Sequence, residues 1–285
     1  MVLAQNSFDV SDTYKQQLQE IFDAELRSVD FANEGPRVAA QVNAWVREKT
    51  RGKIAGILPE GQPLDVILFI LNAIYFKGTW VTKFDSARTE PKPFFNNGIT
   101  EVTKPAMHLK HRFLYAKIST PNAAAVEIPY QEDHFSMVVL LPDSRTGLGE
   151  LRDSLSLPLL ENVTSQLRFR EVILRLPKFD MKIRYDLVPA MRAMGLSSVF
   201  GNAANFTGIS DSTLLRISGA LHKAAVEVNE EGTIATAVTG IFLTPTSALI
   251  RPVPPVEFIV DRPFIFYIRD RRTNRVLFIG EVNHL

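Results

Sequence analysis

The feature that most constrains this chain is a long segment, residues 230–255, between two stretches that are predicted to be strands. Connections inside compact domains rarely reach this length unless they are functional or disordered. Ordinary disorder does not fit, because Val238, Ile241, Phe242 and Leu243 would be exposed to water permanently. We therefore expect a functional loop that has a second place to occupy in the fold.

The first half of this loop alternates in side-chain size, as a strand does. In an extended conformation one face carries the small residues Thr233, Ala235, Ala237 and Thr239, and the other carries Ile234, Thr236 and Val238. Small side chains on one face would let the segment enter between two existing strands without requiring a cavity. Gly232, just upstream, permits the chain to reverse direction.

The rest of the chain has the pattern of one α+β domain. Apolar residues at helical spacing predict helices over residues 11–25, 36–50, 148–155 and 186–194. Strand patterns occupy residues 66–76, 123–130, 135–141, 172–176, 214–228, 258–260, 264–269 and 276–282. The continuously apolar run 66–71 indicates a strand covered on both faces, and so a central sheet. We expect the last strands to be buried, and no linker-like stretch divides the 285 residues into two domains.

Composition excludes several classes of function. The 32 basic and 31 acidic side chains give a net charge of +1, which favours neither a nucleic-acid partner nor a cationic membrane surface. Cysteine is absent, so a disulfide scaffold, a thiolate metal site and a cysteine nucleophile are excluded. The opening residues lack a signal-peptide pattern, and no apolar run is long enough to span a membrane.

Three weaker signals do not support an enzyme or a ligand site. His108 and His111 fall in a strand-like stretch, where their side chains point to opposite faces and cannot share a metal ion. Gly147 and Gly149 lack the third glycine of a dinucleotide fingerprint. The basic run 269–275 is interrupted by an aspartate and is interpreted as a solvated hairpin turn rather than a polyanion site.

Several short motifs resemble those of one protein family and occur in the family's order. Glu230-Glu-Gly-Thr, followed by alternating Ala and Thr, looks like the proximal hinge of inhibitory serpins. Residues 43–46 together with 50–54 resemble the family's helix F. Residues 72–80 resemble the third strand of its sheet A, and residues 222–223 resemble the fifth strand of that sheet. Residues 258–268 match its C-terminal signature. The likeness extends from the start of the chain to its end.

This resemblance implies the serpin fold: a large central mixed sheet A, further sheets B and C, surrounding helices and an exposed reactive-centre loop over about residues 230–255. We expect a single serpin domain over residues 1–285 that lacks the family's N-terminal helices. The lost part would include a helix beneath the sheet and serines that would contact His222.

The resemblance also implies an inhibitor of serine proteases rather than an enzyme. The protease attacks a bait bond, forms an acyl-enzyme, and is carried across the molecule as the cut loop inserts into the sheet. The catalytic serine belongs to the protease, so the chain needs no cofactor or metal. We expect a monomer whose partner is a serine protease, held in a covalent complex.

The bait bond depends on how the loop is counted. Counting from Gly232 puts it at Thr246-Ser247, which suits an elastase-like pocket, and the expected target is elastase- or chymotrypsin-like. Counting back from the C-terminal signature moves it to Leu249 or Ile250. Arg251 would attract trypsin-like enzymes, but a proline follows it.

The resemblance assigns roles to further residues. The hinge comprises Glu230, Glu231, Gly232, Thr233, Ala235 and Ala237. Asn72 and His222 match the shutter at the middle of the sheet, Trp80 matches the breach where the loop first enters, and Lys178 matches the ion-pair partner of Glu230. Asn162 and Asn205 head glycosylation acceptor tripeptides that matter only in the secretory pathway.

Two hypotheses remain open. The first is a protease inhibitor, and the second is a non-inhibitory binding or carrier protein of the same fold. The absence of bulky, charged or proline residues from the inward face of the hinge favours the first. Residues 235–240 and the proline-rich end of the loop are similar to secreted serpins of blood-feeding arthropods such as ticks, so we expect an extracellular location.

Overall fold

The computed structural model describes residues 1–59, 67–131, 134–210, 215–232 and 253–285. The chain divides into two compact units. The first unit comprises residues 1–76 and 181–226, and the second comprises residues 77–180 and 227–285. Among the described residues, no helix is both long and apolar enough to cross a membrane.

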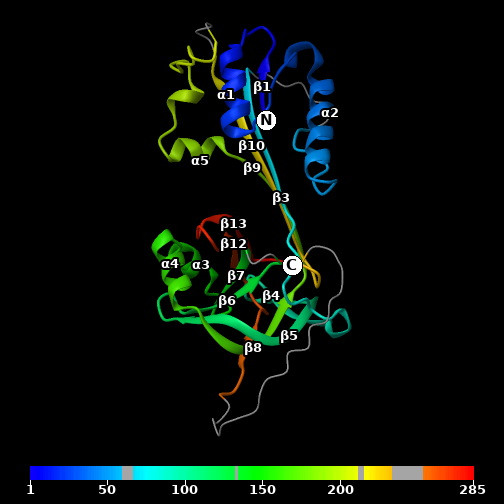
Figure 1. Ribbon diagram of the computed structural model, residues 1–285, viewed down its shortest axis with the longest axis vertical. Helices are drawn as coiled ribbons and strands as arrows, with labels where there is room; N and C mark the ends of the chain where they lie inside the picture. Colours follow the sequence, from blue (N-terminus) through cyan, green and yellow to red (C-terminus); the bar gives the residue numbers. More distant parts are fainter. Residues whose placement is uncertain (60–66, 132–133, 211–214, 233–252) are drawn as a thin grey trace. The chain divides into compact units, whose positions relative to one another are not determined.

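The first unit is built on a five-stranded mixed sheet, whose strands β3, β9 and β10 are prominent in Figure 1. The strand order is β2-β1-β3-β10-β9, for β2 (Leu26–Val29), β1 (Val2–Gln5), β3 (Leu68–Phe76), β10 (Ile217–Val228) and β9 (Phe179–Asp186). β3 pairs in parallel with β10 and antiparallel with β1. The apolar run that predicted a central strand therefore does form the middle of the sheet.

Three helices and a short 3-10 turn belong to the first unit, and one helix, α2 (Phe31–Lys49), packs on the sheet with regularly spaced apolar residues. The other helices are α1 (Asp12–Phe22) and α5 (Val188–Ala193), and the 3-10 turn is η2 (Ser198–Phe200). Val38, Val42 and Val46 of α2 form one buried cluster with Leu71 of β3 and Leu221 of β10. This cluster buries the face of α2 that the helical spacing predicted.

Helix α2 begins five residues before the predicted start at Pro36. The side chain of Asp30 accepts a hydrogen bond from the Asn33 N–H at 3.0 Å and so caps an additional first turn. Glu34 then leaves the helical region, with φ −118° and ψ 22°, and Pro36 follows this kink. The proline lies near the start of the regular part of the helix, where its missing N–H costs little.

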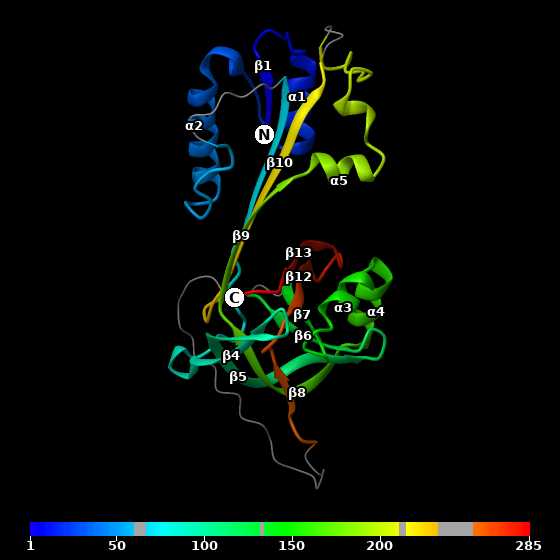
Figure 2. The same cartoon turned by 180° about the vertical axis from the view of Figure 1, so that it is seen from behind.

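The second unit is an eight-stranded sheet in the order β11-β8-β5-β6-β7-β12-β13, with β4 paired to β5. The strands are β4 (Glu90–Asn96), β5 (Thr100–Ile118), β6 (Ala123–Pro129), β7 (Phe135–Pro142), β8 (Arg168–Pro177), β11 (Val256–Ile259), β12 (Phe264–Asp270) and β13 (Val276–Val282). α3 (Leu148–Asp153) and α4 (Leu157–Gln166) lie beside it in Figure 2, and η1 (Ser86–Arg88) precedes β4. Leu151, Leu160 and Val163 pack against this sheet.

The last two strands differ in burial, so the expectation that both are buried was half wrong. Every residue of β12 is buried, because β12 lies between β7 and β13. β13 stands at the end of the described strand order, and Val276, Leu277 and Ile279 are 37%, 44% and 49% exposed. An end strand has one neighbour, so its side chains are less covered.

The basic run 269–275 is a hairpin turn, as predicted, but its first residues are not solvated. Arg269 and Asp270 are buried. Arg269 Nη2 donates hydrogen bonds of 2.9 Å to both carboxylate oxygens of Glu127, which is 1% exposed. Arg271 Nε lies 3.2 Å from the same carboxylate. These arginines therefore stabilise a buried carboxylate and do not form a basic surface.

Candidate functional site

The site lies in the second unit, where residues 229–232 lead from β10 toward the long loop. We call these four residues the anchor turn. The Gly232 N–H donates to Asn229 O at 3.1 Å, which closes the turn. Two main-chain hydrogen bonds tie the turn to the neighbouring segment: the Trp80 N–H donates to Glu231 O at 3.1 Å, and the Phe84 N–H donates to Glu230 O at 3.0 Å.

Gly232 meets two independent requirements of this turn. Its φ is +84°, which side-chain-bearing residues rarely adopt. A Cβ at this position would lie 2.5 Å from both Gly78 O and Trp80 N, which are rigid backbone atoms. The predicted reversal of direction at Gly232 is therefore accompanied by a close packing of two backbones.

Trp80 lies behind the anchor turn and is fully buried. Its Nε1–H donates to Asn229 O at 2.9 Å. Its ring stacks on Tyr130 with centroids 4.4 Å apart and meets the edge of Phe84 at 6.4 Å. The same burial raises the pKa of Tyr130 well above its usual value. This aromatic cluster fixes the position from which the loop departs.

Two ion pairs hold the glutamates of the anchor turn. Glu230 Oε2 lies 2.8 Å from Lys178 Nζ, and Glu230 Oε1 accepts from the Thr89 hydroxyl at 2.8 Å. Glu231 Oε2 lies 2.8 Å from Lys83 Nζ. Burial by itself raises the pKa of Glu230, but the hydrogen bonds from Lys178 and Thr89 reverse this effect and hold it below its usual value.

The lowered pKa of Glu230 predicts a pH-dependent contribution to stability. Above the ordinary pKa of about 4.3 the carboxylate is ionised in both folded and unfolded states, and its folded-state contacts contribute fully. The contribution is lost as the pH falls through the folded-state value. Glu230→Gln should lower the free energy of unfolding by about 1 kcal/mol at pH 7, because the 38% exposed side chain of Lys178 weakens the pair. Urea unfolding should show this difference shrinking as the pH is lowered from 7 into the range where the folded-state carboxylate is protonated, and a difference that stays constant with pH would contradict the assignment.

The other end of the loop is also attached to the second unit. β11 pairs in parallel with β8, from Val256 opposite Val172 to Ile259 opposite Arg175. Lys178, which follows β8, donates its N–H to Pro105 O at 2.9 Å and its Nζ to Glu230. The anchor turn and β11, which flank positions 233–252 in the sequence, are thus both held within the second unit.

The predicted shutter residues lie in the first unit. Asn72 of β3 and His222 of β10 are register partners on adjacent strands. The ring of His222 stacks on Tyr185 at a centroid distance of 6.4 Å, and burial lowers its pKa. Asn72 is exposed, so its role in closing the sheet stays a prediction.

The remaining predicted residues fall into two groups. The acceptor asparagines Asn162 and Asn205 are both exposed. The hinge and bait residues lie outside the described residues: Thr233, Ala235, Ala237, Thr246, Ser247, Leu249, Ile250 and Arg251. In the part of the chain that the structure describes, no cluster of acidic and histidine side chains could hold a metal ion.

Sequence reasoning did not find Lys83, Thr89, Asn229 and Tyr130. Lys83 and Thr89 lie more than 140 positions from the glutamates that they contact. No periodic pattern links residues so distant in one sequence. Asn229 accepts through its main-chain oxygen from the Trp80 Nε1–H, and its side-chain Oδ1 accepts from the Glu231 N–H at 3.1 Å. An asparagine bonded to the backbone two residues on is a turn signal, and this signal in residue type could have found it.

Comparisons with known proteins cover the whole chain. The family model described as "Serpin (serine protease inhibitor)" matches residues 1–285. Iripin-2 of Ixodes ricinus is 41% identical over 281 residues, which are 99% of this chain and 70% of the relative. Leukocyte elastase inhibitor of Bos taurus is 36% identical, over 99% of this chain and 76% of that protein. Uncleaved ovalbumin superposes with a TM-score of 0.88 at 28% identity, over 100% of this chain and 72% of its own.

Proposed function

The chain belongs to the serpin family, and from this premise we propose that it inhibits a serine protease by loop insertion and covalent trapping. The observation that carries the proposal is the anchor turn: a glycine-dependent reversal of direction, held by two ion pairs and Trp80, directly before the small alternating residues of the hinge. The similarity to a protein named leukocyte elastase inhibitor supports a protease as the partner.

Strand directions support insertion into the central sheet of the first unit. β3 and β10 are parallel and paired from Leu68 opposite Ile217 to Phe76 opposite Val226. A strand entering between two parallel strands pairs with both when it runs antiparallel to them. The hinge residues that follow Gly232 would run antiparallel to β3 and β10 if the chain reverses its direction at Gly232 after leaving β10.

Insertion would release enough free energy to distort a bound protease. Each new ladder hydrogen bond contributes roughly 1 kcal/mol net. About ten such bonds, together with apolar burial, amount to on the order of ten kcal/mol. In this proposal the protease supplies the catalytic serine, and the chain supplies the bait and the sheet.

The deciding experiment incubates the chain separately with elastase, chymotrypsin and trypsin, followed by denaturing gels. We expect a complex that survives denaturation, most readily with elastase or chymotrypsin. Mass spectrometry of the released C-terminal peptide locates the bait bond: a peptide starting at Ser247 places it after Thr246, and a later start moves it toward Leu249, Ile250 or Arg251. Clean cleavage without a complex would contradict inhibition by this chain.

A matched pair of variants separates insertion from docking. Ala237→Arg puts a long charged side chain on the face proposed to enter the sheet, so cleavage should continue while the complex is lost. Thr236→Arg makes the same change in charge on the opposite face and should keep the complex. If both variants formed the complex equally well, the insertion model would be wrong.

A non-inhibitory carrier is the second candidate, since thyroxine-binding globulin in complex with thyroxine also superposes on this chain, with a TM-score of 0.87 at 25% identity. A carrier has no need for small side chains on one hinge face. A fully soluble, cleaved product from all three proteases, with no covalent complex, would favour this candidate.

We also propose an extracellular location for the mature protein. The exposure of Asn162 and Asn205 supports it, because glycan acceptors must reach the surface. Expression through a eukaryotic secretory pathway should give a product whose mass falls on treatment with an N-glycosidase. An unmodified product retained in the cell would contradict this.

A further inference from the structure

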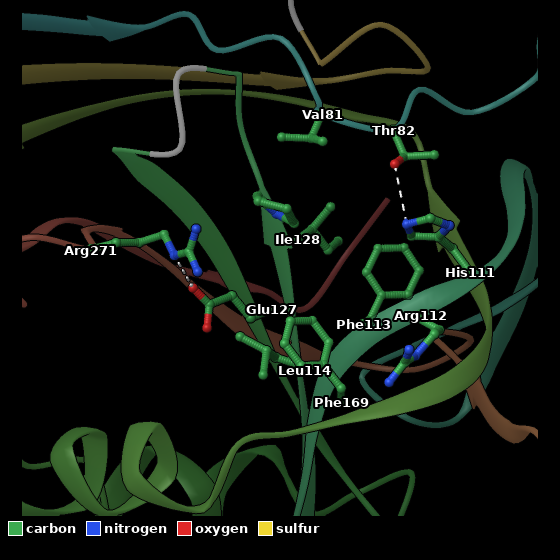
Figure 3. A pocket seen from close by; sticks show the side chains of 11 residues that line it. Val81, Thr82, His111, Arg112, Phe113, Leu114, Glu127, Ile128, Phe169 and Arg271 are labelled. Carbon is green, nitrogen blue, oxygen red and sulfur yellow. Dashed lines mark hydrogen bonds and ion pairs between the residues drawn. The ribbon is translucent and has the colours of Figure 1, made fainter. Parts of the chain in front are cut away.

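A separate pocket of about 200 Å³ opens in the second unit, where β5, β6 and β8 meet the segment that follows Trp80 (Figure 3). Its residues take no part in the contacts of the anchor turn described above. A volume of this size suits a ligand no larger than a two-ring aromatic compound.

The walls of the pocket are largely apolar. Phe113 and Leu114 come from β5, Ile128 from β6, and Phe169 from β8 (Figure 3). The ring of Phe169 is 63% exposed although the residue belongs to a paired strand. An exposed aromatic ring at the edge of an apolar pocket offers a flat surface on which another ring can stack.

Positive charge dominates among the ionisable residues that line this pocket. Arg112 and Arg271 contribute two positive charges, and Glu127 contributes one negative charge. Glu127 is already bound bidentately by Arg269 behind the pocket wall and contacted by Arg271. Among the described residues, Glu127 is thus bound by Arg269 and Arg271, whereas the guanidinium of Arg112 contacts the ring of Phe169.

Arg112 combines the apolar and the charged features. Its guanidinium carbon lies 5.7 Å from the centre of the Phe169 ring. A guanidinium stacked on a ring keeps its N–H groups in its own plane, where they can donate to a carboxylate in bidentate fashion. Opposite, Thr82 Oγ1 and His111 Nε2 lie 3.4 Å apart and supply further polar atoms at the rim.

We propose that this pocket binds a small aromatic carboxylate, with the ring against Phe169 and Ile128 and the carboxylate at Arg112. The site is independent of protease inhibition, since it uses neither the hinge nor the bait. Failure of one proposal therefore leaves the other intact.

The test is calorimetric titration of the full chain with 2-naphthoate and, separately, with the neutral 2-naphthamide. We expect 2-naphthoate to bind with a dissociation constant on the order of 100 µM, and the amide at least about tenfold more weakly. No heat of binding with 2-naphthoate, or equal binding of acid and amide, would overturn the proposal.

Two variants and a matched control locate the binding site. Arg112→Glu and Phe169→Ala change exposed side chains, so both should fold, which thermal unfolding would verify. Each should weaken 2-naphthoate binding by about tenfold or more. Arg170→Glu makes the same charge change one residue from Phe169 on an exposed position outside the pocket lining, and it should change binding by less than about twofold. Equal weakening by Arg112→Glu and Arg170→Glu would indicate only general charge attraction and overturn the site.

Discussion

Replacing Glu127 with alanine is expected to lower the free energy of unfolding by about 3–5 kcal/mol, the cost of leaving a buried charge without its partner. The Arg269 side chain is 9% exposed and donates two hydrogen bonds of 2.9 Å to this carboxylate. Urea unfolding at pH 7 measures this change as a shift in the midpoint urea concentration. The m-value, the slope of the free energy of unfolding against urea concentration, should stay constant.

Two further variants identify the cause of that loss. Glu171→Ala removes a carboxylate 3.2 Å from Lys110, but both side chains are about half exposed, so it should cost less than about 1 kcal/mol. The double replacement Glu127→Leu with Arg269→Met removes both charges and should recover most of the stability. If Glu127→Ala cost no more than Glu171→Ala, the buried pair would not stabilise the sheet.

Replacing Gly232 with valine is expected to detach the anchor turn from Trp80. The substitution forces a β-branched residue into a positive φ and drives its Cβ against backbone at 2.5 Å, with a combined cost of about 2–4 kcal/mol. The Trp80 N–H, which donates to Glu231 O, should then exchange with solvent at least about 30-fold faster. Hydrogen exchange followed by mass spectrometry or NMR measures this local opening.

Gly149 provides the matched control. It lies in α3 and has no atom within 4 Å of its potential Cβ. Gly149→Ala should leave Trp80 exchange unchanged and stabilise the helix by roughly 0.5–1 kcal/mol. If the Trp80 N–H exchanged at an unchanged rate in Gly232→Val, the close packing of the Gly232 backbone against Gly78 and Trp80 would not stabilise the anchor turn.

Elements with a strong local pattern were predicted well from the sequence. The apolar run leading into β3 and the amphipathic spacing of α2 reflect burial, which a single sequence records directly. β7 and β12 were found for the same reason, since nearly all of their residues face protein. The comparisons confirm the family and the serpin fold that the motifs indicated.

Short or exposed elements were missed because their pattern is weak. β1 and β2 have four residues each, too few for a period to appear. α4 is signalled only by Ser156, whose hydroxyl accepts from the Leu159 N–H at 3.4 Å, and by a proline in the first turn. The exposure of β13 depends on which strand lies beside it, and that is a property of topology rather than of residue type.

The candidate site shows the same division. Gly232 was recognised because a left-handed position restricts residue type. Lys178 and Glu230 were paired only through the family resemblance, since 52 residues separate them. Lys83 and Thr89 had no such guide, and their contacts with the anchor turn arise entirely from tertiary structure.

The position of β12 in the sheet has a consequence for co-translational folding. This interior strand pairs with β7, which precedes it by more than a hundred residues and is therefore translated well before it. Until it emerges, one flank of β7 has no partner in the sheet. The nascent chain therefore carries an unpaired apolar strand edge while more than a hundred residues are added, which favours shielding by chaperones and late, rapid closure of the sheet.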